Sequence, residues 1–298
     1  MTEREVTAEQ SFETTERVSE MRRVMRVFMS RGLVVFGLVI LFLFLAVSAF
    51  GPLFAPYNPN QQSLGEILQQ PSSAHILGTD FLGRDTASRL IYGARMSLMV
   101  GVVALGIAAI LGITAGMLAG FLGGWVYAII MRLVDALMAF PMILLALLLA
   151  GLLGGGLKNV MIALGIALIP GYARLMCGQV LAIRENDYVM AGKSMGASNW
   201  RLMFRHILPN AFPPLIVLVT MQIGAAILAE AGLSYLGIGI SPPTATWGSM
   251  VSDGFKYLRT NPLLSFVPGL AIMVVVFAFN MVGDGLRDAL DPRLRGTI

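Results

Sequence analysis

Few residues in this chain have the types and spacing that chemistry requires. The tripeptide Gly192-Lys193-Ser194 matches the end of a P-loop, a glycine-rich turn that wraps around the phosphates of a nucleotide. That loop also needs a glycine five residues before Gly192, where Asp187 stands, and it should follow a buried strand. We therefore expect this chain to bind no ATP through this motif.

The remaining reactive side chains do not form a catalytic set. His75 and His206 are the only histidines, and they fall in segments that we place on opposite sides of a membrane. No nucleophile and base converge, so we expect no enzymatic activity. Cys177 is the only cysteine, which excludes an intrachain disulfide and a metal cluster built from cysteines.

Charges of opposite sign alternate before the second apolar run, at Asp80, Arg84, Asp85 and Arg89. One interpretation is a metal or anion site. The other is that these side chains pair with one another on a helix face at the membrane surface, as charges at this spacing do. We favour the pairing.

Three polar residues within apolar runs are candidates for a translocation pathway or gate. Asp135 is the first candidate. It lies one turn from Arg132, and we expect these two charges to neutralise each other, as charges inside a membrane usually must. Glu230 has no charged partner nearby in the sequence. It is either a pathway or gate residue or the acceptor of an interhelical hydrogen bond that fixes packing. Gln222 is the third candidate.

The elements that position these residues are apolar helices. Of the 298 residues, 56% are hydrophobic and 13% are charged, and the mean hydropathy of +0.77 is too high for a water-soluble domain. The continuous apolar runs approach the roughly 20 residues needed to cross a bilayer, and they do not alternate as barrel strands would. We predict an all-α membrane protein with six transmembrane helices, at Leu33–Phe50, Ser97–Phe121, Ala128–Leu153, Asn159–Cys177, Ala211–Ile238 and Ser265–Gly283.

The basic residues predict the orientation. With the N-terminus inside, 15 of the Lys and Arg side chains fall on the cytoplasmic side and 6 outside, which favours both termini in the cytoplasm. The net charge of +4 follows from this topology, so we expect no nucleic-acid partner. The first apolar run is longer than the core of a signal peptide, and we expect it to remain as an uncleaved helix.

The predicted organisation has four parts. Residues 1–31 form a mobile or surface-lying cytoplasmic arm, and residues 32–96 form the first helix and a long extracytoplasmic loop of turns rather than a folded domain. Residues 97–284 form a five-helix core with a cytoplasmic loop at 182–210, and residues 285–298 form a cytoplasmic tail.

Small residues and prolines predict how the helices pack. Gly112, Gly116, Gly120 and, just past the end of the helix, Gly124 give one helix a face of bare backbone, which allows close approach of a neighbour. We favour packing within the bundle over a dimer seam. Pro141 and Pro170 should kink or break the helices that contain them.

The segment from Tyr188 to Asn210 is a basic island between apolar runs, and it predicts a short helix, a turn at Gly196, a second amphipathic helix and a stop at Pro209. Apolar and basic side chains interleave in it, which is typical of a partner-binding surface. The alternative is a helix that lies on lipid headgroups. The interleaved apolar residues are Val189, Met195, Trp200, Leu202, Met203 and Phe204.

This segment resembles the EAA loop of ABC importer permeases, because Gly196, Leu208 and Pro209 fall at the spacing of that loop. Met190 stands where the family often has a glutamate. In the family the loop docks on the ATPase subunits. The resemblance therefore implies ATPase-coupling roles for Ala191, Gly192, Gly196, Ala197, Trp200, Arg201, Phe204, Arg205, Leu208 and Pro209.

The resemblance extends from about Met25 to the C-terminus. Over this length the chain is similar to the C-type permease subunit of dipeptide, oligopeptide and nickel importers. The similar segments, in order, are His75–Asp80, Gly83–Asp85, Ser88–Arg89, Gly93–Arg95, Asp135 with Ala139–Pro141, Glu230–Gly237, Pro242–Pro243 with Trp247–Gly248, and Gly283–Asp288 with Asp291–Arg293.

The resemblance implies a type I ABC importer permease in a bacterial or archaeal cytoplasmic membrane. Its expected partners are a B-type permease, two ATPases that hold ATP and Mg, an extracytoplasmic substrate-binding protein and membrane lipid. Transport would proceed by alternating access, with dipeptides, oligopeptides, glutathione or nickel chelates as substrates. A rival hypothesis is an ion-coupled secondary transporter, which should show midplane carboxylates or two repeated halves with broken helices.

Overall fold

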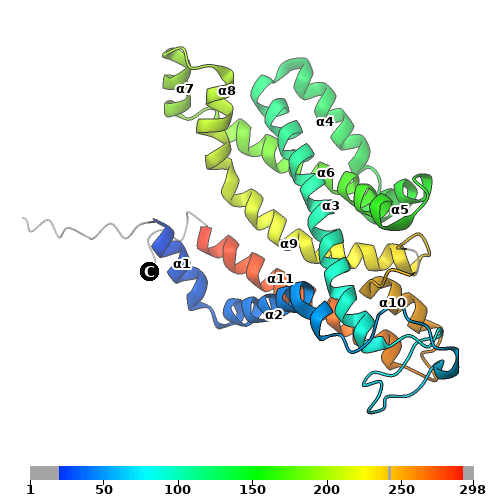
Figure 1. Cartoon of the computed structure of the whole chain (residues 1–298). Coiled ribbons are helices and arrows are strands. Elements are labelled where there is room, and N and C mark those ends of the chain that lie inside the picture. The colour runs from blue at the N-terminus through cyan, green and yellow to red at the C-terminus, as the bar shows by residue number, and fades with distance from the viewer. Residues whose placement is uncertain (1–19, 241–242, 291–298) are drawn as a thin grey trace, which may run out of the picture.

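The computed structural model describes residues 20–240 and 243–290, and these residues are mainly helical (Figure 1). The helices follow from the apolar composition, since a backbone in lipid must satisfy its hydrogen bonds within its own segment. Their bounds are Glu20–Ser30 (α1), Gly32–Phe54 (α2), Leu64–Glu66 (η1), Thr86–Leu122 (α3), Gly124–Met138 (α4), Met142–Leu152 (α5), Gly156–Ile183 (α6), Asp187–Ser194 (α7), Asn199–Arg201 (α8), Leu202–Ile207 (η2), Leu208–Tyr235 (α9), Trp247–Phe255 (α10) and Leu263–Leu290 (α11).

Five helical segments of the described chain are long and apolar enough to cross a membrane, and α4 with α5 provides a sixth span if this bent pair is counted as one. The pair is bent by 93°. The break falls at Pro141, which stands before α5 with φ −54° and ψ 131° and has no N–H to continue the helix. The break predicted at Pro141 is therefore present, whereas Pro170 lies inside the continuous helix α6.

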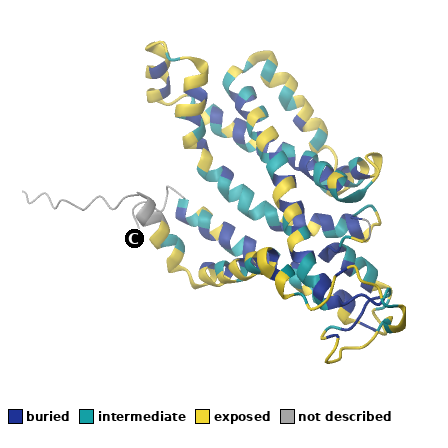
Figure 2. Cartoon of the chain, viewed as in Figure 1, coloured by how far each residue is buried: buried dark blue, intermediate teal, exposed yellow. Residues whose placement is uncertain are grey.

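Helix α6 is the centre of the bundle. In its most apolar stretch 61% of residues are buried, compared with 28% in α2, which lies at the periphery (Figure 2). Large apolar side chains of α2, such as Phe42 and Leu53, are exposed on the protein surface. An apolar periphery is expected where lipid or another membrane subunit replaces water.

The predicted small-residue face joins α3 to α6. A Cβ atom added to Gly112 would lie 2.6 Å from the Cβ of Tyr172, and one at Gly116 would lie 2.3 Å from the carbonyl oxygen of Ala173. At Gly120 the nearest atom, the Cβ of Val180, would be 2.8 Å away. These distances leave no room for a side chain, so these three glycines pack within the bundle, as predicted. Gly124 is not part of this face, because no atom lies within 4 Å of a Cβ added there.

The predicted start of the second transmembrane helix is wrong. Helix α3 begins at Thr86, well before Ser97, because the side chain of Asp85 accepts a hydrogen bond of 2.7 Å from the amide of Ser88 and caps the helix there. A separate helix, α1, occupies residues that we assigned to the cytoplasmic arm, although residues 1–19 of that arm lie outside the described part of the chain.

Helix α1 lies beside the end of α11 (Figure 1). Arg31, at the junction of α1 and α2, forms an ion pair of 2.5 Å with Asp288 of α11. The two ends of the described chain are therefore on the same side of the bundle.

Candidate functional site: coupling loop and outer polar cluster

The predicted docking loop projects from one end of the bundle as α7 and α8 (Figure 1). Gly196 has φ +80° and forms the turn between these two helices, a conformation that glycine adopts without steric cost. Hydrogen bonds of 3.0 Å from the amides of Gly196 and Ala197 to the carbonyls of Lys193 and Gly192 close the turn. Ser198 then caps α8 by accepting from the amide of Arg201. The predicted turn at Gly196 is thus present.

One face of the loop packs on the bundle. Val189, Leu202 and Met203 are buried in a cluster with residues of α3 and α6 such as Met117 and Val180. We predicted that these three apolar residues belong to the partner-binding surface, and this is wrong. Leu202 lies two residues after Trp200, toward the opposite face of the helix, and the bundle itself covers all three side chains.

The other face of the loop exposes an aromatic pair. The side chain of Trp200 is 68% exposed and that of Phe204 is 43% exposed, and their ring centroids are 4.0 Å apart. Arg201 and Arg205 are exposed beside them. Aromatic rings and arginines are the residues that most often anchor protein interfaces. We name these four residues the coupling face.

The second helix of the loop does not stop at Pro209, which corrects our prediction. Helices α8, η2 and α9 are continuous from Asn199 to Tyr235, and Pro209 lies in the first turn of α9. The segment η2 before it is a π-helix, in which the amide of Leu208 bonds the carbonyl of Met203 five residues back. This wider turn accommodates a proline, which lacks the N–H and would crowd the carbonyl of Arg205 in a regular α-helix.

The coupling candidates therefore fall into two groups by exposure. Gly192 is buried, and a Cβ added to it would lie 3.2 Å from Leu202; Ala197 and Leu208 are half-buried. These three residues pack the loop onto the bundle or onto itself. The exposed candidates are Ala191, Gly196, Trp200, Arg201, Phe204, Arg205 and Pro209.

Sequence reasoning missed Arg184, which fastens the start of the loop. Its Nη1 donates a hydrogen bond of 2.9 Å to the carbonyl oxygen of Gly120, at the end of α3, and its Nε lies 3.0 Å from Glu185. A basic side chain near the open carbonyls of a helix end is a recognisable signal once the two elements are known to be adjacent. That adjacency is not visible in the sequence.

The three pathway candidates, Asp135, Gln222 and Glu230, lie at different places in the bundle, and no hydrogen bond or ion pair joins any two of them within the described chain. Asp135 forms its ion pair with Arg174 of α6 and not with Arg132, so that predicted pairing is wrong. Both partners are about half exposed, and the pair joins α4 to α6. Gln222 is half-buried on α9 and faces Gly171 of α6.

Glu230 is fully buried near the opposite end of α9. Its Oε1 accepts hydrogen bonds of 2.7 Å from Ser234 and 3.0 Å from Thr246, while Oε2 has no partner among the described residues. Thr246 is the cap of α10 and exchanges hydrogen bonds with Ser249. Glu230 therefore links α9 to the start of α10.

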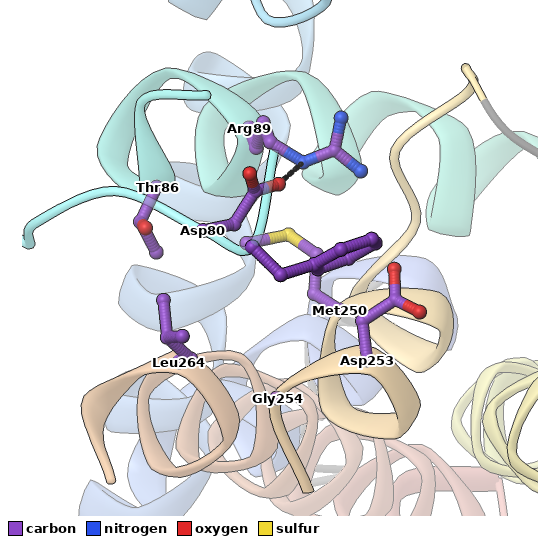
Figure 3. A pocket seen from close by; sticks show the side chains of 8 residues that line it. Asp80, Thr86, Arg89, Met250, Asp253, Gly254 and Leu264 are labelled. Carbon is purple, nitrogen blue, oxygen red and sulfur yellow. Dashed lines mark ion pairs between the residues drawn. The ribbon is translucent and has the colours of Figure 1, made fainter. Parts of the chain in front are cut away.

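The alternating charges form a buried cluster beside α10. The Nε of Arg84 lies 2.6 Å from Asp80 and that of Arg89 lies 3.4 Å from the same carboxylate oxygen, while Asp85 accepts from His75 at 2.9 Å. Figure 3 shows the pair of Asp80 and Arg89. The predicted pairing is therefore present for Asp80 with the two arginines, but Asp85 pairs with His75 instead. However, only Arg89 is helical, and these side chains are buried in a loop that we interpreted as turns alone.

We name His75, Asp80, Arg84, Asp85 and Arg89 the outer polar cluster. It arises because Asp80 meets two guanidinium groups that follow it in the chain, while Asp85 meets the imidazole of His75. Burial strengthens their attraction and makes the loop a packed part of the protein. Within residues 20–240 and 243–290, no group of three or more metal-ligating side chains is suitable for a metal ion.

The sequence profile described as "Binding-protein-dependent transport system inner membrane component" matches residues 112–296, more than half of the chain. The chain belongs to this family of ABC importer permeases. A second profile, the N-terminal TM domain of oligopeptide transport permease C, matches residues 19–71 of the permease and supports the C-type assignment. Membership of an ATP-driven family argues against the ion-coupled rival.

Curated relatives of the permease match nearly its whole length. A dipeptide transport system permease of Alkalihalophilus pseudofirmus is 41% identical over 93% of this chain and 91% of its own. A di/tripeptide transport permease of Pseudomonas aeruginosa is 43% identical over 87% of this chain and 88% of its own. A glutathione transport permease of Pectobacterium atrosepticum is 40% identical over 87% and 86%.

The permease also has the fold of a solved importer. An inward-facing structure of the MetNI methionine ABC transporter superimposes with a TM-score of 0.57, covering 68% of this chain and 97% of that one at 19% identity. Such a low identity supports the fold alone. The type I importer permease fold implied by the sequence resemblance is confirmed.

Proposed function

We propose that this permease forms, with a second B-type permease, the pathway by which peptides enter the cell. It has relatives at 40–43% identity whose names specify dipeptides, di/tripeptides or glutathione. We assign dipeptides or short oligopeptides to it and keep glutathione as the second candidate because of the glutathione relative. Two ATPase subunits supply ATP and Mg, and an extracytoplasmic binding protein delivers the peptide.

The observation that carries this proposal is the coupling face. Trp200 and Phe204 expose a pair of aromatic rings in contact, beside Arg201 and Arg205, on a loop whose opposite face is packed on the bundle. Exposing aromatic rings to water is unfavourable, and a protein partner that covers them removes this unfavourable exposure. The partner that fits is the ATPase, which docks there and moves the loop when it binds and hydrolyses ATP.

The continuous helix explains how this movement reaches the substrate. From Asn199 to Tyr235 the helix has 37 residues, roughly 55 Å at 1.5 Å per residue. One end carries the coupling face, and the other carries Glu230 and its bond to the cap of α10. A displacement of the loop therefore tilts the outer end of α9 and α10, and the π-turn at η2 is where the helix can bend.

The proposed orientation places the coupling loop and both termini in the cytoplasm. The excess of basic residues on that side supports it, and so does the ion pair between Arg31 and Asp288, which holds the two ends of the described chain on one side.

Reconstitution tests the function. The permease is co-expressed with a B-type permease, ATPases and a binding protein from the same organism, and the complex is placed in proteoliposomes. We expect uptake of a labelled dipeptide that requires both ATP and the binding protein and is insensitive to collapse of ion gradients. Uptake driven by an ion gradient without ATP would refute the proposal, and uptake of glutathione alone would select the second candidate.

A further inference from the structure

A polar cleft of about 240 Å³ lies beside the outer polar cluster, at the end of the molecule opposite the coupling face. It lies between the start of α3, the end of α9 and helix α10. Its charged lining residues are Arg89, Asp253 and Lys256, and hydroxyl side chains of Thr244 and Ser252 also line it. The cleft is large enough to admit a small polar solute.

The charged groups that line this cleft balance once the partners of Arg89 are counted. The Nε of Arg89 lies 3.4 Å from Asp80, and its Nη1 donates to the carbonyl oxygens of Pro59 and Pro243 at 3.1 and 3.5 Å. Lys256 is an exposed cation, and Asp253 is a half-buried carboxylate. The cleft therefore offers one cation and one carboxylate without an ion pair among the described residues, which suits a ligand with one charge of each sign.

Asp253 is half-buried but forms no ion pair within 4.0 Å and no hydrogen bond with any residue of the described chain. Burial raises the pKa of its carboxyl group, although Arg84, Arg89 and Lys256 oppose this shift. In Figure 3 the carboxylate of Asp253 and the guanidinium of Arg89 point to the same side, over α10. A carboxylate placed here without a direct partner is suited to a cationic group of a ligand.

We propose that this cleft binds both charged ends of a peptide, with the α-carboxylate at Lys256 and the α-ammonium at Asp253. The inference rests on the proposed function of peptide import and assigns it a receiving site on the permease itself. The hydroxyls of Thr244 and Ser252 are placed to bond the amide groups between the two ends. A simple anion would engage only the cations and leave Asp253 without a partner, and this difference makes the site testable.

Protection of an introduced thiol measures occupancy of the cleft. Cys177, which is buried in α6, is replaced by alanine, and Ser252→Cys is labelled with a water-soluble maleimide in the assembled permease–ATPase complex, without the binding protein. Alanyl-alanine at ten times its Kd should slow the labelling about tenfold. Thr244→Cys provides a second reporter position, and Lys158→Cys, exposed near the start of α6, is the control that peptide should leave unchanged.

The chemistry of the ends is tested with modified peptides. N-acetylated and C-amidated alanyl-alanine should each protect several-fold less than the free dipeptide. Asp253→Asn should abolish the discrimination against the N-acetylated form, and Lys256→Gln should abolish that against the amide. Inorganic phosphate should protect weakly, and equal protection by phosphate and dipeptide would overturn the zwitterion site in favour of a plain anion site.

Uptake by the unmodified complex separates the two proposals. If wild-type proteoliposomes take up dipeptide but no free dipeptide protects either reporter thiol, the cleft is not a receiving site and the import function stands. If the dipeptide protects the cleft but is never taken up, the site is supported and the import function is refuted.

Discussion

The replacement Trp200→Asp should uncouple transport while leaving the permease folded. Trp200 is 68% exposed and its ring contacts mainly that of Phe204, so its loss removes little buried surface from the chain itself. In the proposed complex the same position is covered by the ATPase. An aspartate there must be desolvated, and Arg201 and Arg205 are near enough to offset part of that cost.

The magnitude follows from the burial of an uncompensated charge, which costs about 3–5 kcal/mol when no partner is present. At about 1.4 kcal/mol for each tenfold change in affinity, a cost in this range should weaken docking by roughly 10²- to 4 × 10³-fold. Even with half of the cost offset by the two arginines, the loss is more than about tenfold. Trp200→Phe, which keeps an aromatic ring, should be nearly silent.

The assay is co-purification of the ATPases with the permease, together with peptide-stimulated ATP hydrolysis in proteoliposomes. Trp125→Asp is the matched control, because Trp125 is 74% exposed on α4, outside the loop. It should retain both signals. If Trp200→Asp retains normal co-purification and normal stimulated hydrolysis, Trp200 is not at the ATPase contact, and the loop lies instead on the lipid headgroups.

Four further predictions concern other parts of the chain. The purified permease alone should show no saturable ATP binding in equilibrium dialysis, because Asp187 stands where a phosphate loop needs glycine. Thiols introduced as Ser198→Cys or Leu290→Cys should resist an impermeant reagent added outside intact cells; labelling there would contradict the orientation. Glu230→Ala should lower complex stability by about 1–3 kcal/mol by leaving buried hydroxyls unpaired, whereas Glu230→Gln should lose less; equal thermal unfolding of both would refute this. Because burial raises the folded-state pKa of Asp253, its contribution should become more favourable as pH falls from neutral through that pKa, and Asp253→Asn should flatten this dependence in thermal unfolding at a series of pH values.

The linear order of residues determined the features that depend on local chemistry. Continuous apolar runs can satisfy their backbone only as helices, so the approximate spans followed directly, as did the break at Pro141 and the turn at Gly196. Short-range capping set the start of α3 as well, and the pair Asp85 and Ser88 was a readable signal that we overlooked.

Only the tertiary structure decided which residues meet. Asp135 pairs with Arg174 and not with Arg132 because α4 and α6 lie side by side. Arg184 reaches Gly120 because the ends of α6 and α3 are adjacent. The helical period divided the apolar residues of the loop into two faces, but it could not say that the bundle covers Leu202 and leaves Trp200 exposed. Contacts between residues far apart in the sequence depend on how whole helices pack, and that packing is set by the sum of many small contacts spread along the chain.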